Sequence, residues 1–239
     1  MSAESGLTHC EPGAIVAELI PAPDGRRILH VHLNRPEKRN ALTLAMLEEL
    51  HRRLAQEVEE IVITSAGPSF CAGLDLDECR NDSAWPRPLR HLESLAAVYR
   101  QLLNCPASIV ALVQGFAVGG GVGLAACADV VIAASDSRLR LPAAGELAAM
   151  ARIVHPVIEE RQVARRGQSS WQGGELDARA AQLAGLIDEI AGPDALTERR
   201  NEVLSDTDWR LERPTSWRNP ERCRAIEEGI RMILTNLTR

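Results

Sequence analysis

Three consecutive glycines, Gly119, Gly120 and Gly121, constrain what this chain can fold into more than any other feature. They follow an apolar run of strand character, Ser108–Val113, and precede a stretch of small residues at 122–128. A glycine turn between a strand and a helix lets another backbone approach closely and permits positive φ angles. A second glycine-dependent turn, at residues 70–75, also follows an apolar run. Two such turns can aim two backbone N–H groups at one point.

Alternating strand and helix patterns surround both turns. Two β-rich runs, at residues 14–20 and 27–33, are separated by an Asp-Gly turn signal that predicts a hairpin. Thr43 is a candidate N-cap for a helix whose leucines, followed by Val58, recur at helical spacing. The other expected elements are strands at 60–65, 108–113, 130–134 and 138–141, helices at 89–103 and 122–128, a loop at 79–90, and an almost wholly helical region from residue 146 onward. This order favours an α/β core with substantial parallel pairing.

Composition excludes several classes of function. The 239 residues carry a formal net charge of −6 and only 3 % aromatic residues, which gives neither a basic field nor stacking platforms for nucleic acid. The most apolar stretch, at 108–135, contains five glycines and Asp129, so no membrane span is expected. Six cysteines without a CxxC pair, and no visible signal peptide, predict a reduced, cytoplasmic protein without structural zinc.

Several motifs together resemble the crotonase (enoyl-CoA hydratase/isomerase) superfamily. The matching stretches lie at residues 33–36 (LNRP), 40–42 (NAL), 70–76 (FCAGLDL), 115–121 (GFAVGGG), 127–129 (CAD) and 180–190 (AAQLAGLIDEI). The likeness spans roughly residues 14–191, and the motifs occur in the family's order. Any one of them alone would be a weak signal.

The resemblance implies a spiral of ββα units and a C-terminal helical segment that mediates homotrimers, often paired into hexamers. We therefore expect an acyl-CoA-binding core at 1–191 and an oligomerisation segment at 192–239. Apolar residues recur at helical spacing from Ile226 to Leu237, either at a subunit interface or folded onto the chain's own core. No tightly bound cofactor is expected, because coenzyme A enters as part of the substrate, with an acyl-carrier-protein thioester as the other possible ligand.

In the family, two backbone N–H groups hold the thioester oxygen, and the matched positions here are Leu74 and Gly120. An N–H at the start of a helix has no partner within the helix, so it is available to an anion. Removing one such donor typically costs about 3–4 kcal/mol of transition-state stabilisation. The other interpretation is that the three glycines only permit close packing of a helix on a sheet.

The loops at residues 34–42 and 72–76 are expected to frame the adenine and pantetheine groups. Lys38 and Arg39 are candidates to pair with phosphates, or are solvated loop charges. Asp75 is a candidate binding residue or a structural cap. The remaining candidate binding residues are Ala41, Ala72 and Leu76. Cys71, without an adjacent histidine, is interpreted as a small packed side chain.

The two glutamates that hydratases of this family use are missing. The matched positions hold Gly123 and Ala143, and neither residue can act as an acid or a base. Glu146 lies three residues beyond the second position and is the candidate replacement, or else a helix N-terminal residue favoured by the dipole. His155 is the second candidate base, or a surface residue.

These residues predict an acyl-thioester enzyme that retains the oxyanion hole and has lost the hydratase glutamates. Isomerase or decarboxylase-type lyase chemistry fits better than hydration, because it depends chiefly on stabilising an enolate. The alternative is a non-catalytic subunit of the same fold that supports a partner enzyme. An open slot from Lys38 to Leu74 and Gly120 would favour the enzyme, and a plugged slot would favour the subunit.

Overall fold

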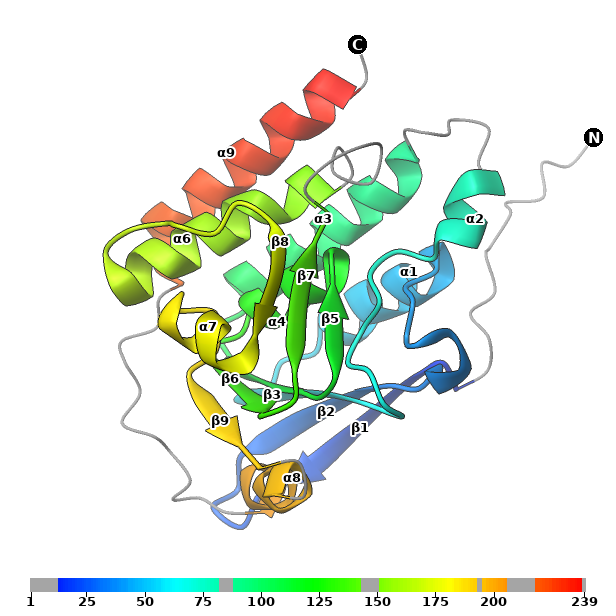
Figure 1. Cartoon of the computed structure of the whole chain (residues 1–239). Helices are drawn as coiled ribbons and strands as arrows, with labels where there is room; N and C mark the ends of the chain where they lie inside the picture. The colour runs from blue at the N-terminus through cyan, green and yellow to red at the C-terminus, as the bar shows by residue number, and fades with distance from the viewer. Residues whose placement is uncertain (1–12, 82–87, 143–150, 193–194, 206–217, 238–239) are drawn as a thin grey trace, which may run out of the picture.

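A computed structural model describes residues 13–81, 88–142, 151–192, 195–205 and 218–237. Within these ranges the chain builds two sheets and a layer of helices (Figure 1). No helix in the described ranges combines the length and the apolar character needed to cross a bilayer.

The larger sheet has six strands in the order β1-β2-β3-β4-β6-β9. Its first two strands form the expected antiparallel hairpin, and the other neighbours pair in parallel. The central strands are buried along their whole length, as parallel strands covered on both faces are. The bounds are β1 Ile15–Pro21, β2 Arg27–Leu33, β3 Glu60–Ser65, β4 Ser108–Val113, β6 Val130–Ala134 and β9 Glu189–Ala191.

A smaller sheet of three strands, β5 (Phe116–Val118), β7 (Arg138–Leu141) and β8 (Gly174–Asp177), runs across the larger one. Strands β5 and β7 pair in parallel, and β7 and β8 pair antiparallel. Strand β5 ends at the glycine triplet, so this sheet positions the second of the two turns.

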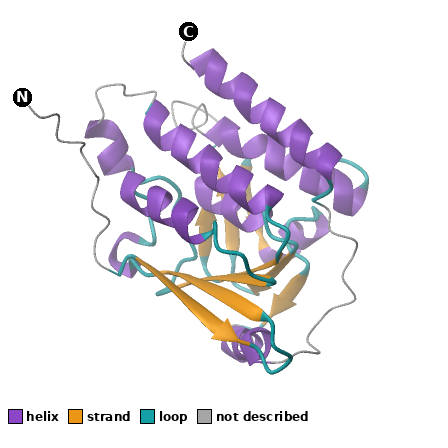
Figure 2. Ribbon diagram, turned by 180° about the vertical axis from the view of Figure 1, so that it is seen from behind, coloured by secondary structure: helices purple, strands orange, loops and turns teal. Residues whose placement is uncertain are grey.

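Helices cover both faces of the larger sheet (Figure 2). The helices α1, α3, α4, α6 and α9 pack against one another on one side, whereas α8 lies on the opposite face against β6 and β9. The helix bounds are α1 Leu44–Arg53, α2 Leu76–Asn81, α3 Leu89–Asn104, α4 Gly120–Ala126, α6 His155–Arg166, α7 Ala178–Leu183, α8 Ala195–Ser205 and α9 Pro220–Leu237, with short 3₁₀ turns at Pro36–Lys38 and Arg152–Val154.

Several expectations need correction. The region after residue 146 is not almost wholly helical, because β8 and β9 each add a short strand to a sheet formed earlier in the chain. The expected loop at 79–90 was wrong in its first residues, since α2 continues to Asn81. Helix α1 has the predicted cap, in which Thr43 Oγ1 accepts from Met46 N, but ends at Arg53 before Val58. Helix α4 starts two residues earlier than expected.

The C-terminal helix packs onto its own chain. Cys223, Ile226 and Ile230 are at most 4 % exposed, and α9 lies against α3 and α6. Just before it, Arg218 pairs with Asp129 at 2.6 Å and donates to the backbone oxygen of Leu102. For this face of α9 the structure therefore selects the second alternative, a helix folded onto its own core.

Candidate functional site

The first glycine turn is held between two other segments of backbone. On one side Cys71 pairs with β5, because its N–H donates to Phe116 O and its carbonyl accepts from Val118 N at 2.9 Å. On the other side Leu42 brackets the turn, donating to Gly73 O at 2.7 Å and accepting from Asp75 N at 2.9 Å. The backbone of this turn is therefore fixed by main-chain hydrogen bonds on both edges.

The second turn lies in direct contact with the first. A Cβ added at Gly73 would lie 2.7 Å from Val118 O and 3.3 Å from Gly120 N. A Cβ added at Gly121 would lie 2.4 Å from Cys71 O. Glycine is required at these positions because the two backbones touch, and Gly73 also has a φ of 86°.

A cavity of about 80 Å³ opens where the two turns meet. Both sequence-predicted donors, Leu74 and Gly120, line it, and no protein acceptor within the described ranges takes a hydrogen bond from either of their N–H groups. Ala72 and Leu76 line the same cavity. The arrangement can place two unpaired backbone donors beside one bound oxygen, which is the geometry of an oxyanion hole.

The rest of the described lining is aliphatic. It consists of Gly73, Leu95, Val118, Gly119, Pro142, Ala151, Ile153 and Val154. No residue of this described lining carries an ionisable side chain. The cavity can therefore polarise a carbonyl through its backbone, while any acid or base must come from elsewhere.

The position matched to the first hydratase glutamate is filled from a neighbouring helix. A Cβ added at Gly123 would lie 2.3 Å from Tyr99 Oη, 2.6 Å from Tyr99 Cζ and 2.9 Å from Val154 Cγ1. Tyr99 is 0 % exposed, and its hydroxyl donates to Gly120 O at 2.9 Å. The surroundings of Gly123 thus leave no open space for a side chain at this position.

The position matched to the second glutamate, Ala143, and the candidate base Glu146 lie outside the described residues. The residues on either side of that gap, Pro142 and Ala151, both line the cavity. His155, the other candidate, is half-buried at the start of α6 and is not part of the described lining. Burial lowers the pKa of His155 and outweighs the opposing effect of Glu159.

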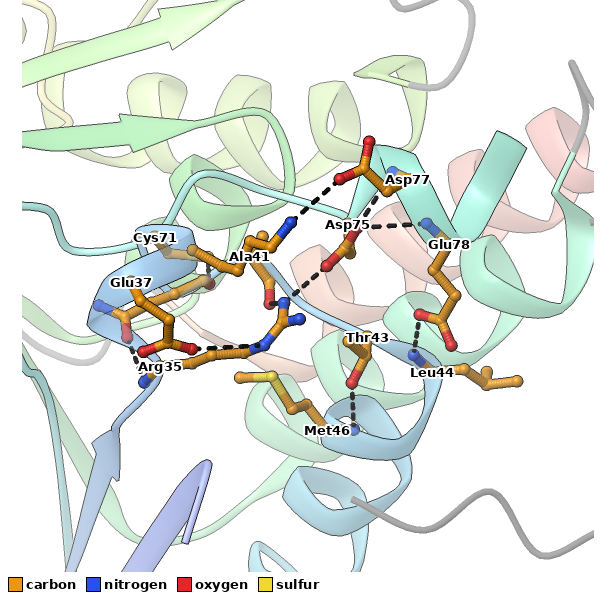
Figure 3. Close-up of polar contacts among 12 residues, drawn as sticks. Arg35, Glu37, Ala41, Thr43, Leu44, Met46, Cys71, Asp75, Asp77 and Glu78 are labelled. Atoms are coloured by element: carbon orange, nitrogen blue, oxygen red, sulfur yellow. Dashed lines mark hydrogen bonds and ion pairs between the residues drawn. The ribbon is translucent and has the colours of Figure 1, made fainter. Parts of the chain in front are cut away.

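Behind the first turn, a buried ion pair joins it to the loop after β2 (Figure 3). Arg35 Nη1 lies 2.6 Å from Asp75 Oδ2, and both residues are less than 10 % exposed. Asp75 Oδ1 also accepts from the N–H groups of Asp77 and Glu78, which start α2. Burial alone would raise the pKa of Asp75, but its hydrogen bonds with Arg35 and with these N–H groups lower it overall. Asp75 therefore anchors the turn from behind and does not face the cavity.

Two other charged residues of this loop, Lys38 and Arg39, lie at the surface. Lys38 Nζ is 3.1 Å from Asp77 Oδ2, and both side chains are at least half exposed, so the pair contributes little stability. Arg39 is exposed and has a left-handed φ of 51°. Neither Lys38 nor Arg39 belongs to the described lining of the cavity. Ala41 is buried, and its carbonyl accepts from Arg35.

Cys71 is a packed side chain, as the sequence indicated. It is 0 % exposed, and its thiol contacts Asn40 O at 3.2 Å. Burial raises the pKa of Cys71 to about 12, against a smaller opposing effect of the Gly73 N–H. A thiol with this pKa is not a nucleophile at neutral pH.

Three residues shape the site without a role predicted from the sequence: Arg35 and Asn40, which belong to the motifs quoted above, and Tyr99, which was not singled out. Asn40 is 0 % exposed, adopts a left-handed φ of 54°, donates to Ala66 O and Ser69 O, and accepts from Arg35 N. The asparagine after a proline-containing turn was the one available signal, because asparagine tolerates positive φ. Nothing local to Tyr99 indicates its partner, which lies 21 residues further along the chain.

Comparison with known proteins agrees with this geometry. The enoyl-CoA hydratase/isomerase family model matches residues 24–208. An enoyl-CoA hydratase of Alternaria alternata is 28 % identical over 227 residues, covering 90 % of this chain and 73 % of that protein. The human mitochondrial Delta(3,5)-Delta(2,4)-dienoyl-CoA isomerase is 32 % identical over 127 residues, covering 47 % of this chain and 39 % of its own length.

Among solved structures, Pseudomonas aeruginosa AtuE has a TM-score of 0.66 and 28 % identity, covering 94 % of this chain and 83 % of its own. The family model spans more than half of the sequence, and the two glycine turns meet at a cavity as the resemblance implied. The chain therefore belongs to the enoyl-CoA hydratase/isomerase family and has the crotonase fold.

Proposed function

We propose that this protein is an acyl-thioester enzyme that stabilises a thioester enolate between the N–H groups of Leu74 and Gly120. The observation that carries the proposal is the cavity where the two turns meet, which both residues line. Within the described residues, neither N–H group donates a hydrogen bond to a protein acceptor. Donors fixed before the ligand arrives stabilise a developing negative charge most effectively, because they need no reorganisation during the reaction.

The reaction that we propose is not hydration. Adding water to an enoyl thioester requires one group to activate the water and another to protonate the α-carbon. The described lining of the cavity contains neither, and Tyr99 and Val154 fill the space beside Gly123. Restoring the first glutamate would require the helix carrying Tyr99 to repack.

Two reactions that pass through an enolate remain open to this site. In decarboxylation of a malonyl-type thioester, the bond between the α-carbon and the carboxylate breaks and CO₂ leaves. The electron pair moves onto the thioester oxygen, and water then protonates the α-carbon. This route needs no base, so two backbone donors are sufficient for it.

Isomerisation of a double bond needs one base, which takes a proton from the α-carbon and returns it at the γ-carbon. Glu146 is the proposed base, because the described residues nearest to it on both sides, Pro142 and Ala151, line the cavity. In this route the carboxylate of Glu146 replaces the family's second glutamate, whose matched position, Ala143, lies three residues earlier in the sequence.

The proposed ligand is an acyl-CoA, or the same phosphopantetheine thioester on a carrier protein. Lys38 and Arg39 are exposed on the loop between β2 and α1, which lies beside the first turn, and there they can meet phosphates. The pairing of Lys38 with Asp77 is a surface contact that a phosphate can replace at little cost. The assembly into trimers or hexamers remains a prediction.

Turnover of three thioesters tests the reaction type. We expect no hydration of crotonyl-CoA, and either decarboxylation of methylmalonyl-CoA or isomerisation of cis-3-enoyl-CoA. Glu146→Gln should abolish isomerisation and leave decarboxylation intact, with Glu159→Gln as a control on the exposed face of α6. Rapid hydration of crotonyl-CoA by the wild-type protein would overturn the proposal.

A non-catalytic subunit is the second candidate. Two observations favour it: the cavity is small and lined by aliphatic residues, and Tyr99 and Val154 occupy the space beside Gly123. The described lining reaches Leu74 and Gly120 but does not extend to Lys38. A folded protein that binds no thioester in calorimetry would select this alternative over the enzyme.

A further inference from the structure

Tyr99 is the only tyrosine of the chain and is completely buried on α3. Its hydroxyl donates to the carbonyl oxygen of Gly120 at 2.9 Å. Tyr99 itself is not among the described residues that line the cavity, but its hydrogen-bond partner Gly120 is. Burial raises the pKa of Tyr99 well above its usual value, so the phenol remains a hydrogen-bond donor at neutral pH.

The glycine triplet needs restraint from outside. Glycine has the largest range of allowed backbone angles, so three in succession cannot hold an N–H in one direction by themselves. Gly119 donates to Arg140 O at 2.9 Å, and Gly121 packs against Cys71 O. Gly120, whose N–H is the proposed donor, is held from its other side by Tyr99 and by the side chain of Leu95.

We propose that Tyr99 is a positioning residue of the oxyanion hole, which fixes the backbone of Gly120 through its hydroxyl and closes the wall beside Gly123 with its ring. The hydroxyl restrains the first peptide of α4, and the N–H of Gly120 lies on the other side of the same Cα atom. The ring occupies the space that a side chain at position 123 would need. The assignment of Gly120 to an oxyanion hole rests on the proposed function, whereas the restraint of Gly120 by Tyr99 does not.

Two structural features support a role for Tyr99 in orienting Gly120. The hydrogen bond joins a buried donor to a buried backbone acceptor, where an unpaired partner is costly. The contact also comes from α3, which packs against α1 and α9 and is therefore held by the rest of the helical layer. The orientation of Gly120 is thus tied to a rigid element and not to its own loop.

The first test uses the protein without ligand. Tyr99→Phe removes only the hydroxyl, and hydrogen exchange followed by NMR reports on the amides of residues 120–124. We expect these amides to exchange about tenfold faster in Tyr99→Phe, the change that one lost hydrogen bond of about 1.4 kcal/mol produces. Ser137→Ala is the matched control, because it removes another buried hydroxyl-to-carbonyl bond, to Val113 O at 3.0 Å. Unchanged exchange in Tyr99→Phe would overturn the proposal.

If Tyr99→Phe does not fold, the role of Tyr99 can be tested with a more conservative replacement that keeps the hydroxyl. Because the chain has one tyrosine, 3-fluorotyrosine added during expression labels position 99 alone. This residue keeps the donor and should keep the exchange rates of the wild type. Faster exchange despite a retained hydroxyl would contradict the assigned role.

The second test measures how strongly the oxyanion hole polarises a bound thioester carbonyl. The infrared band of an acetyl-CoA carrying ¹³C at the thioester carbonyl should move to lower frequency on binding, because two donors polarise the bond. In Tyr99→Phe this shift should shrink, while the affinity for free CoA stays the same. A full shift in the variant would overturn the positioning of the donor. No shift in the wild type would overturn the proposed function, and the exchange measurement would still decide whether Tyr99 restrains Gly120.

Discussion

The hydroxyl of Tyr99 lies 2.3 Å from the point where a Cβ at Gly123 would stand. This contact links two features that the sequence shows only separately: a glycine at the position that the resemblance matches to a hydratase glutamate, and a tyrosine on a different helix. A side chain at position 123 therefore requires Tyr99 to move. The described residues that line the cavity offer backbone donors and no ionisable side chain.

Replacing Gly123 with alanine should destabilise the protein by about 1–3 kcal/mol, because the new methyl group overlaps the Tyr99 ring and Val154. Urea denaturation measures the loss. Gly192→Ala is the control, since among the described residues a Cβ there would meet only Ala195 Cβ, at 3.9 Å. The double variant Gly123→Ala with Tyr99→Leu should recover part of the loss. Equal stability of Gly123→Ala and the wild type would show that the packing is looser than described.

The ionisation of the single tyrosine can be followed directly by absorbance at 295 nm. Its buried environment raises the pKa of Tyr99 well above its usual value, so no tyrosinate should form in the folded protein as the pH passes 10. The neutral phenol contributes stability that is complete below about pH 10 and is lost as the pH rises further. The absorbance step should therefore coincide with alkaline unfolding measured by circular dichroism. A reversible step near pH 10 with retained structure would contradict the burial of Tyr99.

Removal of the buried partner of Asp75 should be costly. Arg35→Ala leaves a buried carboxylate without its cation, and we expect a loss of about 3 kcal/mol in the free energy of unfolding. Arg27→Ala, which breaks an exposed ion pair with Glu59, should cost much less. Urea denaturation at neutral pH separates the two variants, and an equal effect would argue against a structural role for the Arg35 pair.

The same pair predicts a dependence on acid. The pKa of Asp75 is lowered in the folded state, so its contribution is complete above the ordinary value of about 3.9 and is lost as the pH falls below it. Stability of the wild type should therefore fall more steeply below about pH 4 than that of Arg35→Ala. Parallel curves for the two proteins would contradict this assignment.

Much of the fold could be predicted because its signals are local. The hairpin of β1 and β2, the cap at Thr43 and the strands β3, β4 and β6 follow from turn residues and runs of β-branched side chains. The strands β8 and β9 could not be found in this way. They are three or four residues long with few β-branched side chains, and they are strands only because β7 and β6 offer an edge to pair with.

In the site, too, the local features could be predicted from the sequence and the long-range contacts could not. The motifs place Leu74 and Gly120 at one cavity, together with Ala72 and Leu76, as expected from the two glycine turns. The contacts that hold these residues are long-range: Arg35 reaches Asp75 across 40 positions, and Tyr99 reaches Gly120 across 21. A pattern within one segment carries no signal for such pairs, because they depend on how the helices pack.

The most direct measurement of the central claim is a calorimetric titration with acetyl-CoA, crotonyl-CoA and free CoA, compared between the wild type and Gly120→Pro. Proline removes the N–H donor while it is tolerated at the first position of a helix. The account predicts that the wild type binds the acyl thioesters more tightly than free CoA, and that Gly120→Pro removes this difference while still binding CoA. Absence of heat for every ligand, or the same preference in Gly120→Pro, would contradict a thioester site built on Gly120.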